Sequence, residues 1–226
     1  MTNSGPTRSL PDQIADALAS DIVHGRLSGG QRLSEAAVAE RFGVSRGPVR
    51  DALSYLERNM LVTIKPRSYT YVNRLTVWDF DQLFDFRKQL RGLTARYAAR
   101  NRTEEEYQCL RAYIDQHERQ LGENLETYIA NVNHGVEMWQ LVAECSHAGF
   151  ITQQHLGHNT LAFAVQERIT AEKVRYKEYN QIAIWKKMVG AIRRRNENKA
   201  FDHAAESVAV HWEVLREVFV TLFPEK

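Results

Sequence analysis

Hydrophobic residues recur at helical spacing in three short segments near the beginning of the chain. One stripe, within residues 10–24, consists of Ile14, Leu18 and Ile22. A second helix is expected to begin after Ser34, its N-cap, and to end at the Phe42-Gly43 turn. A third helix, starting near Arg46, has an apolar stripe made of Val44, Val49, Leu53 and Leu56. The pattern predicts three small helices around a common core.

Two β-prone runs follow these helices and predict a short hairpin. The runs are Val62-Thr63-Ile64-Lys65 and Tyr69-Thr70-Tyr71-Val72, and Pro66-Arg67-Ser68 separates them. Arg67 is expected at the tip of this hairpin. Three helices followed by a hairpin are typical of a winged helix-turn-helix, so the expected fold of residues 1–75 is a DNA-binding domain.

The third helix carries the residue pattern of a DNA-reading helix. Ser45 is a suitable N-cap whose hydroxyl can accept a backbone N–H, and Pro48 falls in the first turn. Arg46 and Arg50 are four residues apart and therefore share one face close to the positive end of the helix dipole. Such a pair is often only a solvated surface, but here it follows a helix and a glycine turn. We therefore predict contacts to phosphates and base edges.

The pattern changes after Leu75. Prolines are absent until Pro224, the β-prone alternation ends, and helical stripes follow one another. Helices are predicted over residues 79–101, 103–121, 123–144, 160–173, 179–195 and 199–222. The chain is therefore expected to be mainly α, with a winged helix-turn-helix in residues 1–75 and an all-α bundle in residues 76–226.

Composition adds a charge asymmetry and narrows the class of protein. Residues 1–75 contain 10 Lys and Arg against 7 Asp and Glu, whereas residues 76–226 contain 20 against 21, so the modest basic excess lies on the DNA module. No apolar run is long enough for a membrane span and the first residues are polar, which predicts a cytoplasmic protein without a membrane partner. Cys109 and Cys145 have no CxxC spacing, and we expect both to be reduced and buried.

The first module resembles the GntR family of bacterial transcription regulators. The similar motifs are Leu33-Ser34-Glu35, Phe42-Gly43-Val44-Ser45-Arg46 and Pro48-Val49-Arg50-Asp51-Ala52-Leu53, within a match over roughly residues 8–75. The resemblance implies a homodimer on a palindromic DNA operator. The residues expected at the DNA are Ser34, Ser45, Arg46, Gly47, Arg50 and Arg67. Two positions depart from the family pattern, because Gly47 replaces a more usual threonine and Tyr69 replaces a usual glycine.

The second module is similar to the FCD effector domain of FadR-type members of that family. The best local match, Leu83-Phe84-Asp85-Phe86-Arg87-Lys88-Gln89-Leu90, resembles the first effector-domain helix with its cavity-facing arginine, which is Arg87 here. Arg91 occupies a position that is usually acidic. The resemblance implies a small carboxylate effector, with Arg87, His134, Trp185 and His211 as the candidate binding residues.

The same resemblance implies a divalent metal ion, Zn²⁺ or similar, bound by an aspartate and three histidines. His134 and His211 fit the first and the last of these histidines, but Ala130 stands at the aspartate position and Trp185 at the middle histidine. Losing one anionic ligand and one nitrogen ligand removes much of the affinity for such an ion. Asn131, His155 and His158 are alternative ligands, although His155 and His158 also fit a polar loop.

The function predicted from these patterns is a ligand-responsive transcription regulator, acting as a repressor. Effector binding is expected to shift the DNA modules through the short connection formed by residues 73–77. Two other classes remain open. Seven histidines in the second module suggest a metal-dependent hydrolase or oxygenase, although no HExxH motif is present. The remaining class is an architectural DNA-binding protein without an effector. The run Arg193-Arg194-Arg195 fits the basic end of a helix.

Overall fold

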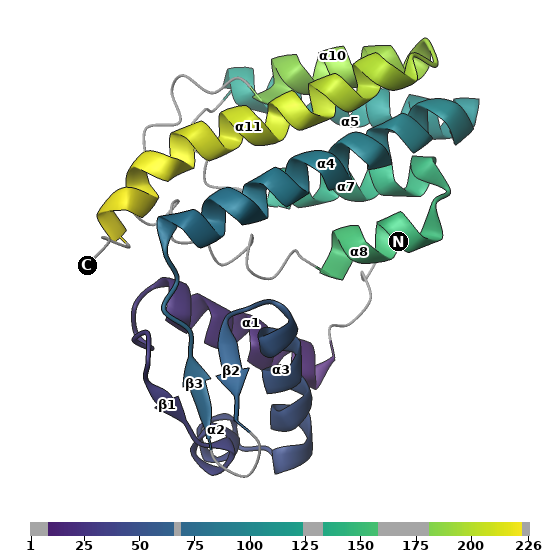
Figure 1. Cartoon of the computed structure of the whole chain (residues 1–226). Coiled ribbons are helices and arrows are strands. Elements are labelled where there is room, and N and C mark those ends of the chain that lie inside the picture. The colour runs from purple at the N-terminus through teal and green to yellow at the C-terminus, as the bar shows by residue number, and fades with distance from the viewer. Residues whose placement is uncertain (1–8, 66–68, 124–132, 158–180, 223–226) are drawn as a thin grey trace. The chain divides into compact units, whose positions relative to one another are not determined.

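The computed structural model describes residues 9–65, 69–123, 133–157 and 181–222 (Figure 1). The chain separates into two units, one that ends at Leu75 and one that begins at Thr76. Each unit buries its own apolar side chains.

The first unit combines three helices with a small antiparallel sheet. In chain order its elements are α1 (Leu10–Val23), β1 (Arg32–Leu33), α2 (Glu35–Phe42), α3 (Arg46–Arg58), β2 (Val62–Ile64) and β3 (Thr70–Val72). The sheet order is β1-β3-β2, with Leu33 opposite Thr70 and Thr63 opposite Tyr71. The predicted helices and hairpin are present. The sequence pattern does not predict β1, because two residues are too few to show a period.

The core of this unit is formed by the predicted apolar stripes. Ile14, Leu18, Val49, Leu53 and Leu56 are all almost completely buried, whereas Val44 is only partly buried. Burial of each such side chain contributes about 1.5–3 kcal/mol, and together they fix the orientation of α3 against α1. The opposite face of α3 is left at the surface.

The ends of the helices follow the sequence signals except at two serine hydroxyls. Ser9 and Asp12 form a reciprocal capping box at the start of α1. Gly43 ends α2 with φ of 65°, a left-handed conformation that favours glycine. Ser34 and Ser45 occupy the N-cap positions of α2 and α3, but neither side chain makes the expected hydrogen bond to the helix backbone. The prediction that the Ser45 hydroxyl caps α3 is therefore wrong. The first backbone N–H groups of α3 are therefore left for another hydrogen-bond acceptor.

The second unit is entirely helical in the described residues. Its elements are α4 (Val77–Asn101), α5 (Glu104–Glu123), α7 (Asn133–Ser146), α8 (Gly149–Gly157), α10 (Gln181–Arg193) and α11 (Glu197–Leu222). Helices α4 and α11 run side by side along this unit, and α4 also packs against α7, α8 and α10 (Figure 1). A capping box between Thr76 and Asp79 begins α4, and Thr103 and Glu106 cap the start of α5 in the same way.

Several predicted helix boundaries change. Helix α5 continues to Glu123, and the helix predicted over residues 123–144 begins at Asn133 in the structure. No helix is predicted at α8, because its sequence has almost no amphipathic period and so shows no helical stripe. His155 consequently belongs to a helix. The helix predicted over residues 160–173, together with Asn131 and His158, lies outside the described residues.

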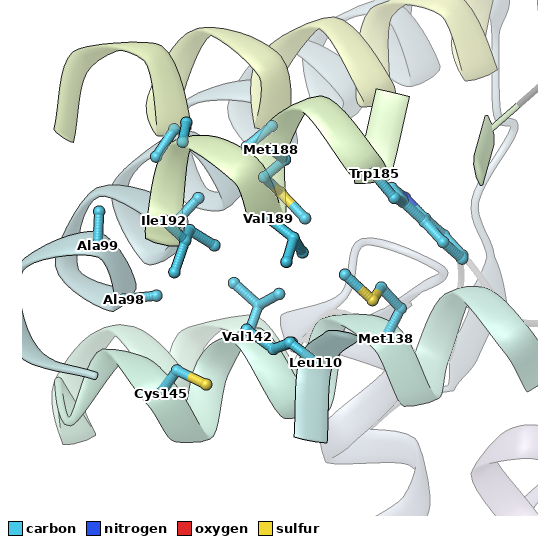
Figure 2. Close-up of a cluster of buried hydrophobic side chains, with 14 of the residues drawn as sticks. Ala98, Ala99, Leu110, Met138, Val142, Cys145, Trp185, Met188, Val189 and Ile192 are labelled. Atoms are coloured by element: carbon cyan, nitrogen blue, oxygen red, sulfur yellow. The ribbon is translucent and has the colours of Figure 1, made fainter. Parts of the chain in front are cut away.

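The core of the helical unit lies where α4, α5, α7, α10 and α11 meet. Figure 2 shows Trp185, Met188, Val189 and Ile192 of α10 facing Met138 and Val142 of α7, and Leu110 of α5 belongs to the same cluster. Cys145 is buried in this cluster, and desolvation raises the pKa of its thiol to about 12, so it stays protonated. Cys109 is exposed, which contradicts the expectation that both cysteines are buried.

Candidate nucleic-acid interface and effector site

The predicted DNA-contacting residues of α2 and α3 form one exposed surface. Ser34, Ser45, Arg46, Gly47 and Arg50 are all exposed, while the opposite side of α3 is packed against the core. Because Gly47 has no side chain and nothing lies near its Cβ position, the surface between Arg46 and Arg50 is open. The structure therefore places two guanidinium groups and the Ser45 hydroxyl in the first part of α3, and the Ser34 hydroxyl at the start of α2.

We name this surface, which consists of Ser34, Ser45, Arg46, Gly47 and Arg50, the reading surface. Its two arginines differ in their local partners. Nε of Arg50 donates to Oε2 of Glu35 at 2.8 Å, an ion pair whose side chains are 64% and 36% exposed. Arg46 forms no ion pair with any residue in the described ranges. An exposed pair of this kind is worth up to about 1 kcal/mol, so Arg50 can leave Glu35 for a phosphate or a base at small cost.

The hairpin carries an aromatic and basic surface of its own. The Arg32 guanidinium stacks on the ring of Tyr69, and Lys65 lies 5.4 Å from the ring centroid of Tyr71. Tyr69, which departs from the family pattern, thus packs on β1 and on Tyr71. Arg67, predicted at the hairpin tip, lies outside the described residues.

In the helical unit, the structure brings together two of the four predicted effector residues. His211 of α11 stacks on Phe84 of α4 with ring centroids 6.3 Å apart, and the guanidinium carbon of Arg87 lies 5.4 Å from the same Phe84 ring. Trp212 also stacks on Phe84, with ring centroids 4.4 Å apart. Its indole N–H donates to Asp81 at 2.7 Å, which fixes α11 against α4 at this point.

The electrostatics of this site follow from burial and from like charge. Desolvation lowers the pKa of Arg87 to about 10, which leaves it charged at neutral pH. Desolvation also lowers the pKa of His211 to about 3, and the charges of Arg87 and Arg91 lower it further. Both Arg87 and His211 keep part of their surface exposed, so the group is accessible. His211 is therefore neutral at pH 7 and lies beside two cations.

Trp185, a third predicted effector residue, has different surroundings. Trp185 is completely buried in the apolar core (Figure 2), and its indole N–H has no hydrogen-bond partner among the described residues. His134 lies in the first turn of α7. Sequence reasoning did not include Arg91 in the site. Its position one helical turn after Arg87 was the available signal, since it places both on the same face of α4.

The residues at this site do not fit the metal ion that the resemblance implies. Within the described residues, no group of three or more His, Cys, Asp or Glu side chains is arranged to hold a metal ion. Trp185, at the position of the middle histidine, offers a buried N–H donor and no lone pair to a cation. Arg87 and Arg91 would repel a cation. The donor set suits an anion instead.

Comparison with known sequences assigns both units to described families. The model for "Bacterial regulatory proteins, gntR family" matches residues 10–72, and the model for the FCD domain matches residues 82–210. The chain belongs to the GntR family and carries an FCD domain. The HTH-type transcriptional repressor RspR of Escherichia coli K12 is 28% identical over 185 residues, which cover 80% of this chain and 75% of RspR. The regulator YdhC of Bacillus subtilis is 29% identical over 136 residues, 60% of each protein.

Solved structures agree on the fold. The E. coli protein McbR/YncC superposes with a TM-score of 0.69 at 17% sequence identity. The superposition covers 94% of this chain and 100% of the McbR/YncC chain. A GntR family member from Pseudomonas syringae gives a TM-score of 0.52 at 17% identity, covering 95% of this chain and 87% of its own. The chain is thus a transcription regulator of the GntR family, which sets aside the metal-dependent enzyme. No helix in the described parts has the length and hydropathy for a membrane span.

Proposed function

We propose that this GntR-family protein is a cytoplasmic repressor that binds a palindromic operator as a homodimer and responds to a small carboxylate bound in its FCD domain. The observation that carries the DNA-binding part is the reading surface, where Arg46 and Arg50 are exposed at the beginning of α3. The name of RspR as a repressor supports the direction of regulation.

The reading surface suits both parts of operator recognition. A guanidinium group forms two parallel hydrogen bonds with a guanine edge, and the beginning of a helix attracts phosphate. The Ser34 and Ser45 hydroxyls make no helix-capping bond, so they are available to donate to phosphate oxygens. Two such surfaces in a dimer would read the two halves of an inverted repeat.

The route from effector to DNA is the connection between the two units. Strand β3 ends at Val72 and α4 begins at Val77, so only four residues separate the wing from the helix that carries Arg87. Asn73 in this connection donates through its side chain to the carbonyl of Met60 and accepts from Thr63, which ties it to the hairpin. A rotation of α4 on effector binding would therefore be passed to the wing.

The test is operator binding by the full-length protein. A DNA motif is first selected from random sequence at physiological salt, and affinities of wild type, Arg46→Ala and Arg50→Ala are then measured by fluorescence anisotropy across a salt series. Each substitution should weaken specific binding by about 1–3 kcal/mol, because each removes one guanidinium contact. The matched control is Arg58→Ala, an exposed arginine at the far end of the same helix, which should bind like wild type.

Three outcomes would contradict parts of the proposal. Unchanged specific binding by both variants would mean that α3 is not the reading helix. Failure to select any motif, with binding that depends only on salt, would favour the architectural alternative. The oligomeric state is measured by sedimentation with and without the selected duplex, and a monomer bound to a single half-site would exclude the homodimer.

A further inference from the structure

A pocket of about 250 Å³ lies between α5 and α10, which pack together in the helical unit (Figure 1). It contains no residue of the DNA or effector sites described above. Its floor is apolar, since the side chains of Tyr107, Ile114 and Val189 are buried there. The charged side chains that line it are exposed; they are Arg111, Asp115, Lys186, Arg193 and Arg194. Four of these five are cationic, so the pocket attracts anions.

The run Arg193-Arg194-Arg195 does more than provide a basic helix end. Such a run commonly offsets the helix dipole and the free carbonyls of the last turn. Here Arg102 already donates to two carbonyls at the end of α10, at 3.4 and 2.8 Å. Arg195 donates to two carbonyls at the end of α4, at 2.6 and 3.2 Å. Neither helix end requires the side chains of Arg193 and Arg194, and both of these line the pocket.

The positive charge of the pocket is incompletely neutralised. Arg193 and Arg194 form no ion pair with any residue in the described ranges. Glu104 interacts with the charge of Arg193, but its ion pair is with Arg102. The other two cations of the pocket each have one carboxylate partner on α5. An anion that enters the pocket therefore meets two guanidinium groups whose donors are available.

The pocket is open because Gly190 has no side chain. A Cβ at this position would lie 3.5 Å from Nη1 and 3.7 Å from Nη2 of Arg194, so the guanidinium lies against the α10 backbone beside Gly190. Lys186 is one helical turn earlier, on the same face of α10. A glycine inside a helix costs up to about 1 kcal/mol relative to alanine, so stability is exchanged here for space beside the cations.

We propose that this α5–α10 pocket binds a compact phosphate monoester, whose phosphate contacts Arg193 and Arg194 and whose remaining atoms lie on the apolar floor. A phosphate monoester carries almost two negative charges at neutral pH and has three strong acceptor oxygens, which suit several donors from different directions. The volume is below that of most pockets for drug-sized ligands, which favours a compact molecule. The site is separate from the carboxylate site proposed above.

The first experiment compares esters with their neutral and inorganic parts. Full-length protein without DNA is titrated with phenyl phosphate, glycerol 3-phosphate, inorganic phosphate, phenol and glycerol, at constant ionic strength adjusted with NaCl. Binding is followed by calorimetry and by thermal shift. At least one ester should bind about threefold or more tightly than inorganic phosphate, because it also covers the apolar floor. Phenol and glycerol should bind at least about tenfold more weakly than their esters, because they lack the charge.

The second experiment separates the pocket from overall charge. Arg193→Gln and Arg194→Gln should each weaken ester binding by about fivefold or more, since each removes charge-assisted hydrogen bonds. Gly190→Leu keeps every charge but fills the pocket, and it should weaken binding by about tenfold or more. Lys186→Gln should weaken binding by about threefold, whereas Lys187→Gln is the matched control and should bind like wild type. Both lysines lie on α10 and pair with one carboxylate, but Lys187 does not line the pocket.

Several results would overturn the proposal. These are the absence of ester binding, equal binding of esters and inorganic phosphate, unchanged binding in Arg194→Gln, or equal losses in Lys186→Gln and Lys187→Gln. Circular dichroism verifies that each variant is folded, and Arg194→Gln tests the site even where Gly190→Leu does not fold. Weaker non-specific DNA binding by Arg194→Gln, in a protein that binds no ester, would instead assign this surface to nucleic acid. All ligand titrations omit DNA, so their outcome is independent of the operator-binding proposal.

Discussion

The reading surface of the first unit and the arginine group of the FCD domain use the same side chain in opposite settings. Arg46 and Arg50 lie on a solvent-exposed face of one helix, where a large polyanion can contact them. Arg87 and Arg91 are partly buried between helices, where desolvation shifts the pKa of Arg87. A surface site is specified by the spacing within one helix, whereas the interior site requires three helices to be packed in one way.

The largest effect should follow from removing the support of the reading surface. Leu56 is completely buried beneath α3, and Leu56→Ala should destabilise the first unit by about 3 kcal/mol, because it removes buried methyl groups and leaves a cavity. All four tryptophans lie in the helical unit, at positions 78, 139, 185 and 212. Hydrogen exchange in α3 should therefore accelerate, while the unfolding transition seen by tryptophan fluorescence stays close to that of wild type. A shifted fluorescence transition would show that the two units unfold together.

The packing of α4 on α11 offers a test of the interior site. A Cβ at Gly92 would lie 2.5 Å from the ring of Phe201, whereas a Cβ at Gly190 in α10 would meet nothing closer than 3.5 Å. Gly92→Ala should destabilise the helical unit by about 1–2 kcal/mol, because overpacking exceeds the gain in helix propensity. Gly190→Ala is the matched control and should be stabilising by up to about 1 kcal/mol. Urea denaturation followed by tryptophan fluorescence measures both, and equal effects would contradict the close approach of the helices.

The helical unit should lose stability as the pH falls from 7 to 5. His211 has a pKa of about 3 in the folded protein, below its ordinary value near 6.5, so the unfolded chain binds more protons in this window. The free energy of unfolding should therefore fall, by about 1–2 kcal/mol at pH 5 given the partial exposure of the ring. His211→Phe should flatten this dependence in the same fluorescence assay. An equally steep pH dependence in that variant would assign the effect to another group.

The smallest effect is expected at the ion pair within the reading surface. Glu35→Gln removes the partner of Arg50, and because the pair is exposed, unfolding free energy should change by no more than about 0.5 kcal/mol. Operator affinity should stay the same or rise slightly, because Arg50 no longer has to leave a carboxylate before it contacts DNA. The affinity is measured by fluorescence anisotropy at one salt concentration. A marked loss of specific binding would show that Arg50 needs Glu35 in order to contact the operator.

Sequence patterns predicted most of the reading surface but only part of the arginine group in the helical unit. In the first unit, the cap positions, the Gly43 turn and the apolar stripe of α3 were sufficient to place Arg46 and Arg50 on an exposed face. In the helical unit, the stripe of α4 indicated a buried helix and the resemblance pointed to Arg87. No local pattern could show that His211, more than one hundred residues away, stacks on the same ring as Arg87.

The sequence by itself determined the structural features that depend on residues close together along the chain. These features comprise the helices, the hairpin, the turn glycine and the charged face of α3, because backbone propensity and side-chain periodicity act over a few residues. The tertiary structure alone decided that Arg91 joins Arg87 and His211, that Trp185 fills the core, and that Cys109 is exposed. These properties depend on which helices meet and on how much water their contact excludes. The burial that shifts a pKa arises only when segments distant in the sequence pack together.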